Sequence, residues 1–459
     1  MLLLDVGSTY TKLAVLDQDR KQLIATACAP TTLDDVSLGF SQALDGLQAQ
    51  SVPARLLAPR YACSSAAGGL RMVAVGLVPQ LTVEAARRAA LGAGARVVAT
   101  YSFSLTRPQL AEIEALRPDI VLLAGGTDGG DRKTVIRNAR ALAWARLEGP
   151  VVFAGNQEAA DSVRRVFARA GRELYLADNV MPTVSQINVD SVREVIRQVF
   201  LQRIVVAKGL DKISRLIDAI VFPTPLAVLI AARALARLVE GGLVVIDVGG
   251  ATTDVHSVAE GIPCDPQVIV KGLPEPYAKR TVEGDMGVRH NVAAIVEAVG
   301  RRELLARPGL GGELSLERLD ALVGAWSQQT SALPEGDLEE RLDTELAAAA
   351  AGIAMDRHVG RLEELWTPLG RHWVQYGKDL TRVGAVIGTG GPLVYSRRPR
   401  AILERTLYDP QNPFLLKPRA PRLYVDARYA LFAVGLVSQV RPEWAEEVAA
   451  GYLGEMQAV

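Results

Sequence analysis

The chain has 459 residues, a formal net charge of zero, 49% hydrophobic residues and 22% charged residues. Its length allows two or three domains with separate cores, and its composition is typical of a globular protein. The lack of a basic excess argues against nucleic acid or an anionic membrane surface as a partner, and the three widely spaced cysteines argue against a disulfide framework.

The start of the chain shows no basic segment or cleavage site before Asp5, so the sequence predicts no signal peptide. The longest apolar stretch, residues 225–239, is interrupted by Arg233 and Arg237 and is too short to span a bilayer. We therefore expect a cytoplasmic protein without a membrane segment.

The N-terminal part of the sequence predicts a mixed sheet. Residues 1–17 have the pattern of strand, tight turn and strand, and residues 21–30 have the pattern of a third strand. A helix is expected at 36–50, followed by an apolar run that ends near residue 69. This order indicates a sheet with helices packed on it.

Alternating strands and helices follow. Helical spacing at 82–94, 134–147 and 158–171 alternates with short apolar runs, which predicts an α/β sheet whose loops line a crevice at the strand ends. We interpret the glycine-rich loop 124–131 as a structural or partner-contacting loop. Ser191 and an acidic residue three positions later have capping-box spacing, which predicts the start of a helix there.

The opening pattern returns in the second half of the sequence. After a predicted helix at 226–240, residues 243–258 (LVVIDVGGATTDVHSV) repeat the apolar run, aspartate and small-residue turn of residues 1–17. Residues 262–273 are expected to form the third strand of this copy, and residues 292–370 to be mostly helical. The repetition predicts that the chain consists of two related halves.

Each copy of the turn is suited to phosphate. Turns rich in Gly, Ser and Thr expose backbone N–H groups that bind anions, and a lysine that follows the first turn can contact a phosphate as a point charge. A single turn of this kind is weak evidence because plain hairpins carry it too, but two copies favour a phosphate clamp between the halves. The predicted phosphate-binding residues are Asp5, Gly7, Ser8, Thr9 and Lys12 in the first copy and Gly249, Gly250, Thr252 and Thr253 in the second.

The aspartates at the two strand ends imply a cation. Asp5 and Asp247 would repel phosphate, and Mg²⁺ prefers carboxylates together with phosphate oxygens. We therefore predict that Asp5 and Asp247 are Mg²⁺ ligands. Asp254, near the second turn, could orient water or metal, so Asp247 and Asp254 are the candidate catalytic residues.

Two further glycine loops are candidates for nucleotide contacts. Residues 386–392 suit the close approach of a nucleoside; a structural turn is the alternative, and a dinucleotide fingerprint is disfavoured because its glycine pattern is incomplete. Residues 283–291 enter a helix whose N-terminus favours anions, and a simple helix entry is an equal alternative. The residues predicted from these loops are Gly284, Asp285, Gly388, Thr389, Gly390 and Gly391.

These motifs, in this order, resemble those of the actin, sugar kinase and heat-shock chaperone ATPase superfamily. LLDVGSTYTKLAVLD is similar to its first phosphate motif, VIDVGGATTDVHSV to its second, VIGTGGPL to its adenosine motif and FPTPLAVLIAARAL to its connecting helix. The resemblance implies an α/β fold of two duplicated ribonuclease-H-like halves, residues 1–225 and 226–459, around an interdomain cleft for ATP and Mg²⁺. A helical insertion is expected at about 292–370.

A closer resemblance spans almost the whole chain. Strings such as VLLAGGTDGGD, ADNVMPTVSQINVDSVREVIRQVF, AKGLDKI and RTVEGDMGVRHN resemble the MutL (GlmL) family, whose members are encoded with adenosylcobalamin-dependent glutamate mutase and similar aminomutases. The family is unrelated to the mismatch-repair protein of the same name. The resemblance implies an ATP-driven, chaperone-like reactivase that opens the mutase and releases damaged cobalamin. No mutase activity is expected of the chain itself.

One position departs from the superfamily pattern. Heat-shock chaperones carry a glutamate before the Pro-Thr of the connecting helix, where it helps to position the attacking water; here the residue is Phe222. Hydrolysis is therefore expected to be slow, to depend on Asp247 or Asp254, or to be absent. A metabolite kinase, an ATP-coupled ring-opening hydrolase and a nucleotide-dependent scaffold without hydrolysis stay open as alternatives. The identity of the mutase, the need for a companion subunit and assembly into a homo-oligomer stay open too.

Overall fold

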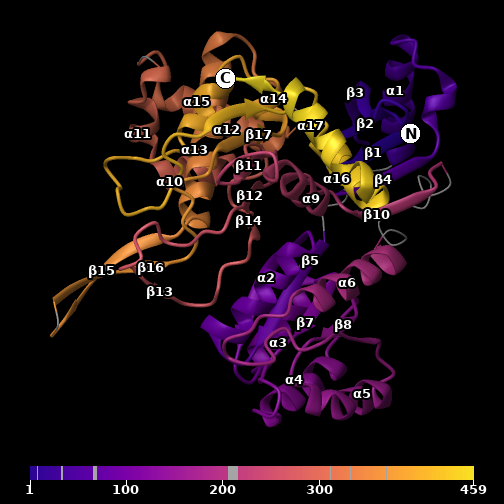
Figure 1. Ribbon diagram of the computed structural model, residues 1–459, viewed down its shortest axis with the longest axis vertical. Helices are drawn as coiled ribbons and strands as arrows, with labels where there is room; N and C mark the ends of the chain where they lie inside the picture. The colour runs from indigo at the N-terminus through magenta and orange to yellow at the C-terminus, as the bar shows by residue number, and fades with distance from the viewer. Residues whose placement is uncertain are drawn as a thin grey trace.

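The computed structural model describes residues 1–7, 9–32, 35–65, 70–204, 216–310, 312–330, 332–368 and 370–459. Within these ranges the strands form four sheets (Figure 1). Two of the sheets are built alike and belong to the two predicted halves. A third forms an inserted domain, and the fourth is a three-stranded extension of the second half.

The sheet of the first half has the strand order β10-β4-β1-β2-β3. Its central strand, β1, pairs antiparallel with β2 and parallel with β4, and Asp5 lies opposite Lys12 in the first of these ladders. β1 is buried along its whole length, as expected of an apolar central strand. Helix α1 (Val36–Ala49) packs on β2 and β3. The strands are β1 (Leu2–Val6), β2 (Tyr10–Asp17), β3 (Gln22–Pro30), β4 (Arg60–Ser64) and β10 (Ala219–Pro223).

The sheet of the second half repeats this plan in the order β14-β12-β11-β17-β18-β19. β11 pairs antiparallel with β12 and parallel with β17, as β1 does with β2 and β4. The predicted α/β fold with two duplicated, ribonuclease-H-like halves is therefore confirmed. The strands are β11 (Leu243–Val248), β12 (Thr253–Val258), β14 (Ala278–Glu283), β17 (Ala385–Thr389), β18 (Arg422–Val425) and β19 (Gln457–Ala458).

Two helices join the halves. α9 (Thr224–Ala236) and α16 (Leu431–Val440) pack on each other and lie between the two sheets (Figure 1). Gly435 of α16 comes so close to α9 that a Cβ at this position would collide with the carbonyl oxygen of Ala227. Apolar residues of both sheets belong to the core around these helices. The predicted connecting helix is thus part of a core that the two halves share.

Residues 70–199 form a domain inserted between β4 and β10, in the lower part of Figure 1. Its strands are all parallel, in the order β6-β5-β7-β8-β9. One face of this sheet has a core of its own, and the other face shares a core with the first half. The expected alternation of strands and helices is present, but the residue pattern predicted no boundary between this domain and the first half. Its elements are β5 (Leu70–Gly76), α2 (Glu84–Gly92), β6 (Ala95–Ser102), α3 (Arg107–Leu116), β7 (Ile120–Leu123), α4 (Lys133–Trp144), β8 (Val151–Phe153), α5 (Ala160–Arg169), β9 (Leu174–Leu176) and α6 (Asp190–Val199).

The helical segment of the second half ends at His358 rather than near residue 370. β15 (Arg361–Thr367) and β16 (Gly370–Tyr376) then form an antiparallel hairpin that projects from the body (Figure 1), and β13 (Ile269–Lys271) pairs with β16. Among the residues described, none of the helices has the length and apolar character that crossing a bilayer requires. The helices of this half are α10 (Val292–Val299), α11 (Arg301–Leu305), α12 (Leu316–Gln328), α13 (Asp337–His358), α14 (Gly391–Val394), α15 (Pro399–Glu404) and α17 (Ala445–Glu455).

One local prediction is wrong, and another is correct only in part. The third strand of the second copy is β14, whereas the predicted residues 262–273 contribute only β13, which pairs in the three-stranded extension. The apolar residues of β13 are exposed, so they fill no core. The helix predicted to start at Ser191 is present, since α6 begins at Asp190, but it has no side-chain cap. The Ser191 hydroxyl instead accepts a hydrogen bond from the backbone amide of Asp178.

Candidate functional site

Three predicted motifs meet between the halves. A Cβ built on Gly250 of the second phosphate turn would lie 3.9 Å from the hydroxyl oxygen of Thr9 in the first turn. A Cβ built on Gly390, in the loop after β17, would lie 2.8 Å from a carboxylate oxygen of Asp247 and would collide with the carbonyl oxygen of Val248. Gly390 also has a φ of 93°, which glycine adopts without strain. The geometry therefore requires glycine here and brings all three motifs to one place.

Asp5 is buried in β1 and has partners from three other elements. Its Oδ2 lies 2.7 Å from Nζ of Lys12 in β2. Its Oδ1 accepts hydrogen bonds from the hydroxyl of Thr224 at the start of α9 and, at 3.6 Å, from Sγ of Cys63 in β4. Burial and the nearby Asp5 carboxylate raise the pKa of the Cys63 thiol, so the thiol keeps its proton as the donor. Sequence reasoning missed Thr224 and Cys63, because strand pairing and the position of α9 bring them to Asp5.

Lys12 lies between a carboxylate of the first half and an aromatic ring of the second. Its Nζ lies 3.9 Å from the centroid of the Tyr429 ring. Burial disfavours the charged ammonium, but the Asp5 carboxylate outweighs this effect, and the pKa of Lys12 is raised above its ordinary value. Asp247 acts in the same direction as Asp5. A permanent positive charge therefore lies next to both phosphate turns.

Asp247 occupies the equivalent strand position in the second half. It is partly buried, opposite Asp254 in the β11–β12 ladder and opposite Thr389 in the β11–β17 ladder. Burial, and then the Asp254 carboxylate, raise the pKa of Asp247 to about 7, although Lys12 acts in the opposite direction. A carboxyl group with a pKa near neutrality suits proton transfer, and a nearby cation would favour its ionised form.

The carboxylates fit a magnesium ion that is bound together with phosphate. No cluster of three or more metal-type side chains exists in the part of the chain that the structure describes. Mg²⁺ commonly keeps several waters and takes one or two carboxylates plus substrate phosphates, so a full protein cage is not needed. Asp5 Oδ2 is buried and already pairs with the Lys12 ammonium at 2.7 Å. Of the two predicted ligands, Asp247 could hold Mg²⁺ directly, and Asp5 could do so in exchange for its contact with Lys12.

Asp254 is already engaged by a cation. It is 6% exposed, and its Oδ1 accepts from Nε of Arg280 at 2.8 Å and lies 2.5 Å from Nη2 of the same residue. Its Oδ2 accepts from the Thr252 hydroxyl at 3.1 Å. Asp254 thus fixes the second turn and has one oxygen occupied by Arg280, which competes with the predicted role in orienting water. Sequence reasoning missed Arg280, because it lies on β14, a strand that was not predicted.

Residues 283–291 hold the second phosphate turn in place through hydrogen bonds. The backbone amides of Arg289 and the residue after it both donate to the carbonyl oxygen of Gly250 at 2.9 Å. The Thr253 hydroxyl donates to the carbonyl oxygen of Met286 at 2.6 Å. The side chain of Thr253 therefore joins the second turn to residues 283–291.

Gly284 and Asp285 contact arginines of other elements. The Arg96 guanidinium of the inserted domain donates to the carbonyl oxygen of Gly284 at 3.4 Å. Asp285 pairs with Arg357 of α13 at 2.8 Å, and this hydrogen bond lowers the pKa of Asp285. Their contact with a nucleotide stays a prediction.

The loop after β17 is tied to the second half and contacts the first. The Thr389 hydroxyl donates to Asp426 at 2.8 Å, and Asp426 also accepts from backbone amides at the start of α16. Tyr395 follows the loop, with its ring centroid 6.3 Å from that of Tyr10 and its hydroxyl 3.2 Å from Sγ of Cys28. The side chain of Thr389 is therefore structural, and Tyr395 links the halves beside the loop.

Two predicted features lie elsewhere. Ser8 and the string at 207–213 are outside the described residues. Phe222 is 1% exposed, lies opposite Cys63 in the β10–β4 ladder, and belongs to the core shared by the halves. It offers no polar group to an attacking water, in keeping with the expectation of slow or absent hydrolysis.

Comparison with known proteins gives one family over nearly the whole chain. The sequence model of the family described as MutL protein matches residues 1–453. Protein MutL of Clostridium tetanomorphum is 44% identical over 459 residues, which is 98% of this chain and 98% of that protein.

Solved structures are similar at a much lower level. Nucleotide-free acetone carboxylase matches 95% of this chain and 70% of its own, with 13% identity and a TM-score of 0.40. Nucleotide-free diol dehydratase-reactivating factor matches 96% of this chain and 99% of its own, with 11% identity and a TM-score of 0.36. Both likenesses are too weak to carry an argument about function.

Proposed function

The chain belongs to the MutL protein family, and we propose that it is an ATP-binding, chaperone-like accessory protein of an adenosylcobalamin-dependent mutase, namely glutamate mutase or a similar aminomutase. The observation that carries the ATP-binding part is the meeting of two like turns and one glycine loop, with Lys12 and Asp247 beside them. The choice of a mutase as partner rests on the family resemblance.

The turns supply the groups that triphosphate binding needs. Backbone N–H groups of both turns, the Thr9 hydroxyl and the Lys12 ammonium would bind the phosphates. Asp5 and Asp247 would hold Mg²⁺, which neutralises charge between carboxylates and phosphates. The backbone of residues 388–391 would lie against the nucleoside at Gly391, where a Cβ would meet no atom within 4 Å.

Hydrolysis would be slow. Asp247 is the carboxyl group beside the second turn that could accept a proton from water, but Mg²⁺ bound to it would lower the pKa of about 7 that it has without the ion and weaken it as a base. Phe222 provides no second polar group, and Asp254 is engaged by Arg280. ATP would therefore be held for long periods, and the halves would move about the core of α9 and α16 when it binds and leaves.

Movement of the halves would open the partner mutase so that damaged cobalamin can leave. To test this, the purified chain is mixed with ATP–Mg²⁺ and glutamate mutase blocked by damaged cobalamin. We expect cobalamin to be released with ATP only, and activity to return when adenosylcobalamin is added. The absence of both release and recovery would contradict the reactivase proposal.

Asp247→Ala tests the site within the same assay. We expect this variant to lose ATP-dependent release. The matched control is Asp320→Ala, which removes an exposed aspartate of the same half that pairs with Arg301 at 2.8 Å. Equal losses in both variants would argue that the second turn has no specific role.

Phe222 favours one further candidate function, a nucleotide-dependent scaffold that does not hydrolyse ATP. Under this alternative, a non-hydrolysable ATP analogue with Mg²⁺ would support cobalamin release in repeated cycles as well as ATP does. Under the main proposal, the analogue supports one round of release at most, because reopening of the halves needs hydrolysis.

A further inference from the structure

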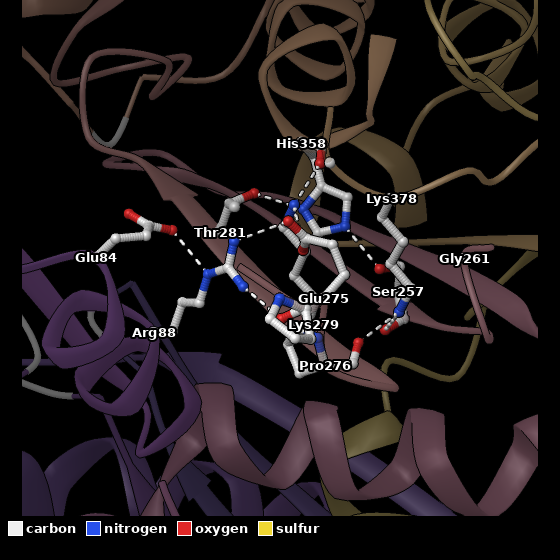
Figure 2. A network of polar contacts seen from close by, with 12 residues as sticks. Glu84, Arg88, Ser257, Gly261, Glu275, Pro276, Lys279, Thr281, His358 and Lys378 are labelled. Atoms are coloured by element: carbon white, nitrogen blue, oxygen red, sulfur yellow. Dashed lines mark hydrogen bonds and ion pairs between the residues drawn. The ribbon is translucent and has the colours of Figure 1, made fainter. Parts of the chain in front are cut away.

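The inserted domain is fastened to the second half at β14. Arg88 of α2 donates through Nη1 to the carbonyl oxygen of Pro274 at 2.7 Å and pairs through Nη2 with Glu275 at 2.8 Å. Its Nε also pairs with Glu84 at 2.8 Å, as Figure 2 shows. The segment that precedes β14 is therefore tied to α2, and a displacement of α2 would move this segment too.

A second layer of contacts holds β14 to the rest of its half. Lys279 donates to the carbonyl oxygen of His358 at 2.9 Å, and the two ring nitrogens of His358 lie 2.7 Å from the Thr281 hydroxyl and 2.8 Å from the Ser257 hydroxyl (Figure 2). Lys378 donates to the carbonyl oxygen of Pro276 at 2.9 Å. β14 is thus joined to β12 and α13 by buried polar contacts and moves with them.

Arg280, on the same strand, spans from the second phosphate turn to the inserted domain. Its Nε and Nη2 engage Asp254, whose other oxygen holds Thr252 of the turn. Its Nη1 donates to the carbonyl oxygens of Leu91 at 3.1 Å and Ala95 at 2.8 Å, where α2 ends and β6 begins. Arg280 is 5% exposed, so one buried guanidinium connects the two parts.

The physical properties of this side chain suit it to transmit movement. A guanidinium is planar and presents its donors in a fixed fork, so a shift of Asp254 changes the bonds on the opposite side of the fork as well. Both carbonyl acceptors belong to backbone, which cannot rotate away as a side chain can. Loss of either bond would leave a buried donor unpaired, which is costly.

We propose that Arg280 is the positioning residue that couples the nucleotide state of the second phosphate turn to the inserted domain. The inference rests on the proposed ATP binding and adds a route by which ATP acts on a part of the chain outside the two halves. Coupling is reciprocal, so a partner that holds the inserted domain would change ATP affinity by the same factor.

The test compares two arginines of the same interface in the full-length chain. Arg280→Lys keeps a positive charge beside Asp254, but a lysine lacks the fork that reaches Leu91 and Ala95. Arg88→Lys is the matched control, because Arg88 also joins α2 to the second half and its described contacts do not include the phosphate turn. Circular dichroism checks that both variants are folded.

Two quantities are measured for each protein: ATP–Mg²⁺ affinity by calorimetry, and hydrogen exchange of residues 84–102 with and without ATP–Mg²⁺. In the unchanged chain we expect ATP to slow exchange in this segment about fivefold or more, the lower range of typical coupling. Arg280→Lys should bind ATP and lose this protection, whereas Arg88→Lys should retain it.

The outcomes separate the inference from the function on which it rests. If the unchanged chain binds no ATP, the proposed function fails. If it binds ATP and exchange in residues 84–102 does not change, the coupling is absent although the function stands. Full protection in Arg280→Lys, or equal loss in both variants, would show that Arg280 is only one structural contact among several.

Discussion

The ammonium of Lys12 compensates a buried carboxylate, so its removal should harm both stability and binding. Lys12→Met leaves Asp5 without its ion-pair partner, and breaking a buried pair costs about 3–5 kcal/mol. We expect a lower free energy of unfolding by urea denaturation and a weaker affinity for ATP–Mg²⁺. The control is Lys21→Met, because Lys21 pairs with Glu447 at the surface and such pairs contribute about 0–1 kcal/mol. Equal effects of the two substitutions would contradict this account of Lys12.

The carboxyl group of Asp247 should make stability depend on pH in a defined direction. Its pKa is raised from 3.8 to about 7 by burial and by Asp254. The folded state therefore resists its ionisation, and stability is lost as the pH rises from about 4 to about 7. Asp247→Asn stays neutral, so its advantage in Tm over the unchanged chain should be small at pH 4 and grow up to pH 7, by an amount that corresponds to about 1 kcal/mol or more in the free energy of unfolding.

The same measurement in the presence of Mg²⁺ and nucleotide gives the second half of this prediction. A cation beside Asp247 favours its ionised form, so the advantage of Asp247→Asn should shrink or reverse. Other groups that titrate near neutrality, such as Lys378, are common to both proteins and cancel in the difference. A difference in Tm that does not change with pH would contradict the assigned environment.

Part of the site could be predicted from sequence at the level of single residues. Asp5, Thr9, Lys12 and Asp247 lie within contiguous motifs, and a hairpin fixes which of them come together. Thr224, Cys63 and Arg280 could not be found in this way, because parallel strand pairing, a helix start and an unpredicted strand bring them in. Such contacts depend on tertiary packing, which local patterns do not encode.

The loop between β17 and α14 has a conformation that only glycine accepts at one position. Gly390→Ala places a Cβ against Val248 at a φ of 93°, where strain costs about 1–3 kcal/mol. We expect the loop to shift and ATP affinity to fall about tenfold or more, because a loss of about 1.4 kcal/mol in binding free energy lowers affinity tenfold. Gly272→Ala is the control, because Gly272 has a similar φ of 99°, a Cβ there meets no atom within 4 Å, and it lies outside the predicted nucleotide loops. Calorimetry on both variants checks this, and equal affinities would contradict the role of Gly390.

Buried side chains are mostly apolar in the strands that were predicted correctly and polar in the strand that was missed. β1 and β11 are apolar and almost entirely buried, so the residue pattern reveals them. The residue pattern of β14 is polar and does not indicate a buried strand. Arg280 and Thr281 are nevertheless buried, because hydrogen bonds rather than apolar contacts satisfy their side chains. β13 reads as a strand, and is one, but its apolar residues are exposed. Burial of polar groups depends on partners that are distant in sequence.

The packing of α9 against α16 should control how the two halves are held together. Gly435→Ala would force a Cβ into the carbonyl oxygen of Ala227, and overpacking of a core costs about 1–3 kcal/mol. We expect a lower Tm and unfolding of the halves in separate steps, measured by calorimetry. The control is Gly454→Ala in α17, where a Cβ meets no atom within 4 Å. A single unchanged transition in Gly435→Ala would contradict a tight contact between these helices.

The arrangement of the whole molecule was only partly predictable. The repeated motif indicated two like halves, because duplication leaves the same local pattern twice. The inserted domain was not separated from the first half, since its strands and helices alternate as in any α/β unit. Its order β6-β5-β7-β8-β9 is set by pairing between distant strands. The limits of such a domain follow from which strands pair, and this information is not local.

The central claim is that the two turns bind the phosphates of one ATP molecule between them. It is tested most directly by a crystal structure of the chain with Mg²⁺ and a non-hydrolysable ATP analogue. We predict phosphates between the turns that contain Thr9 and Gly250, Mg²⁺ near Asp5 and Asp247, and the nucleoside against residues 388–391. A nucleotide bound elsewhere, for example on the inserted domain, or no nucleotide at saturating concentration would contradict the claim.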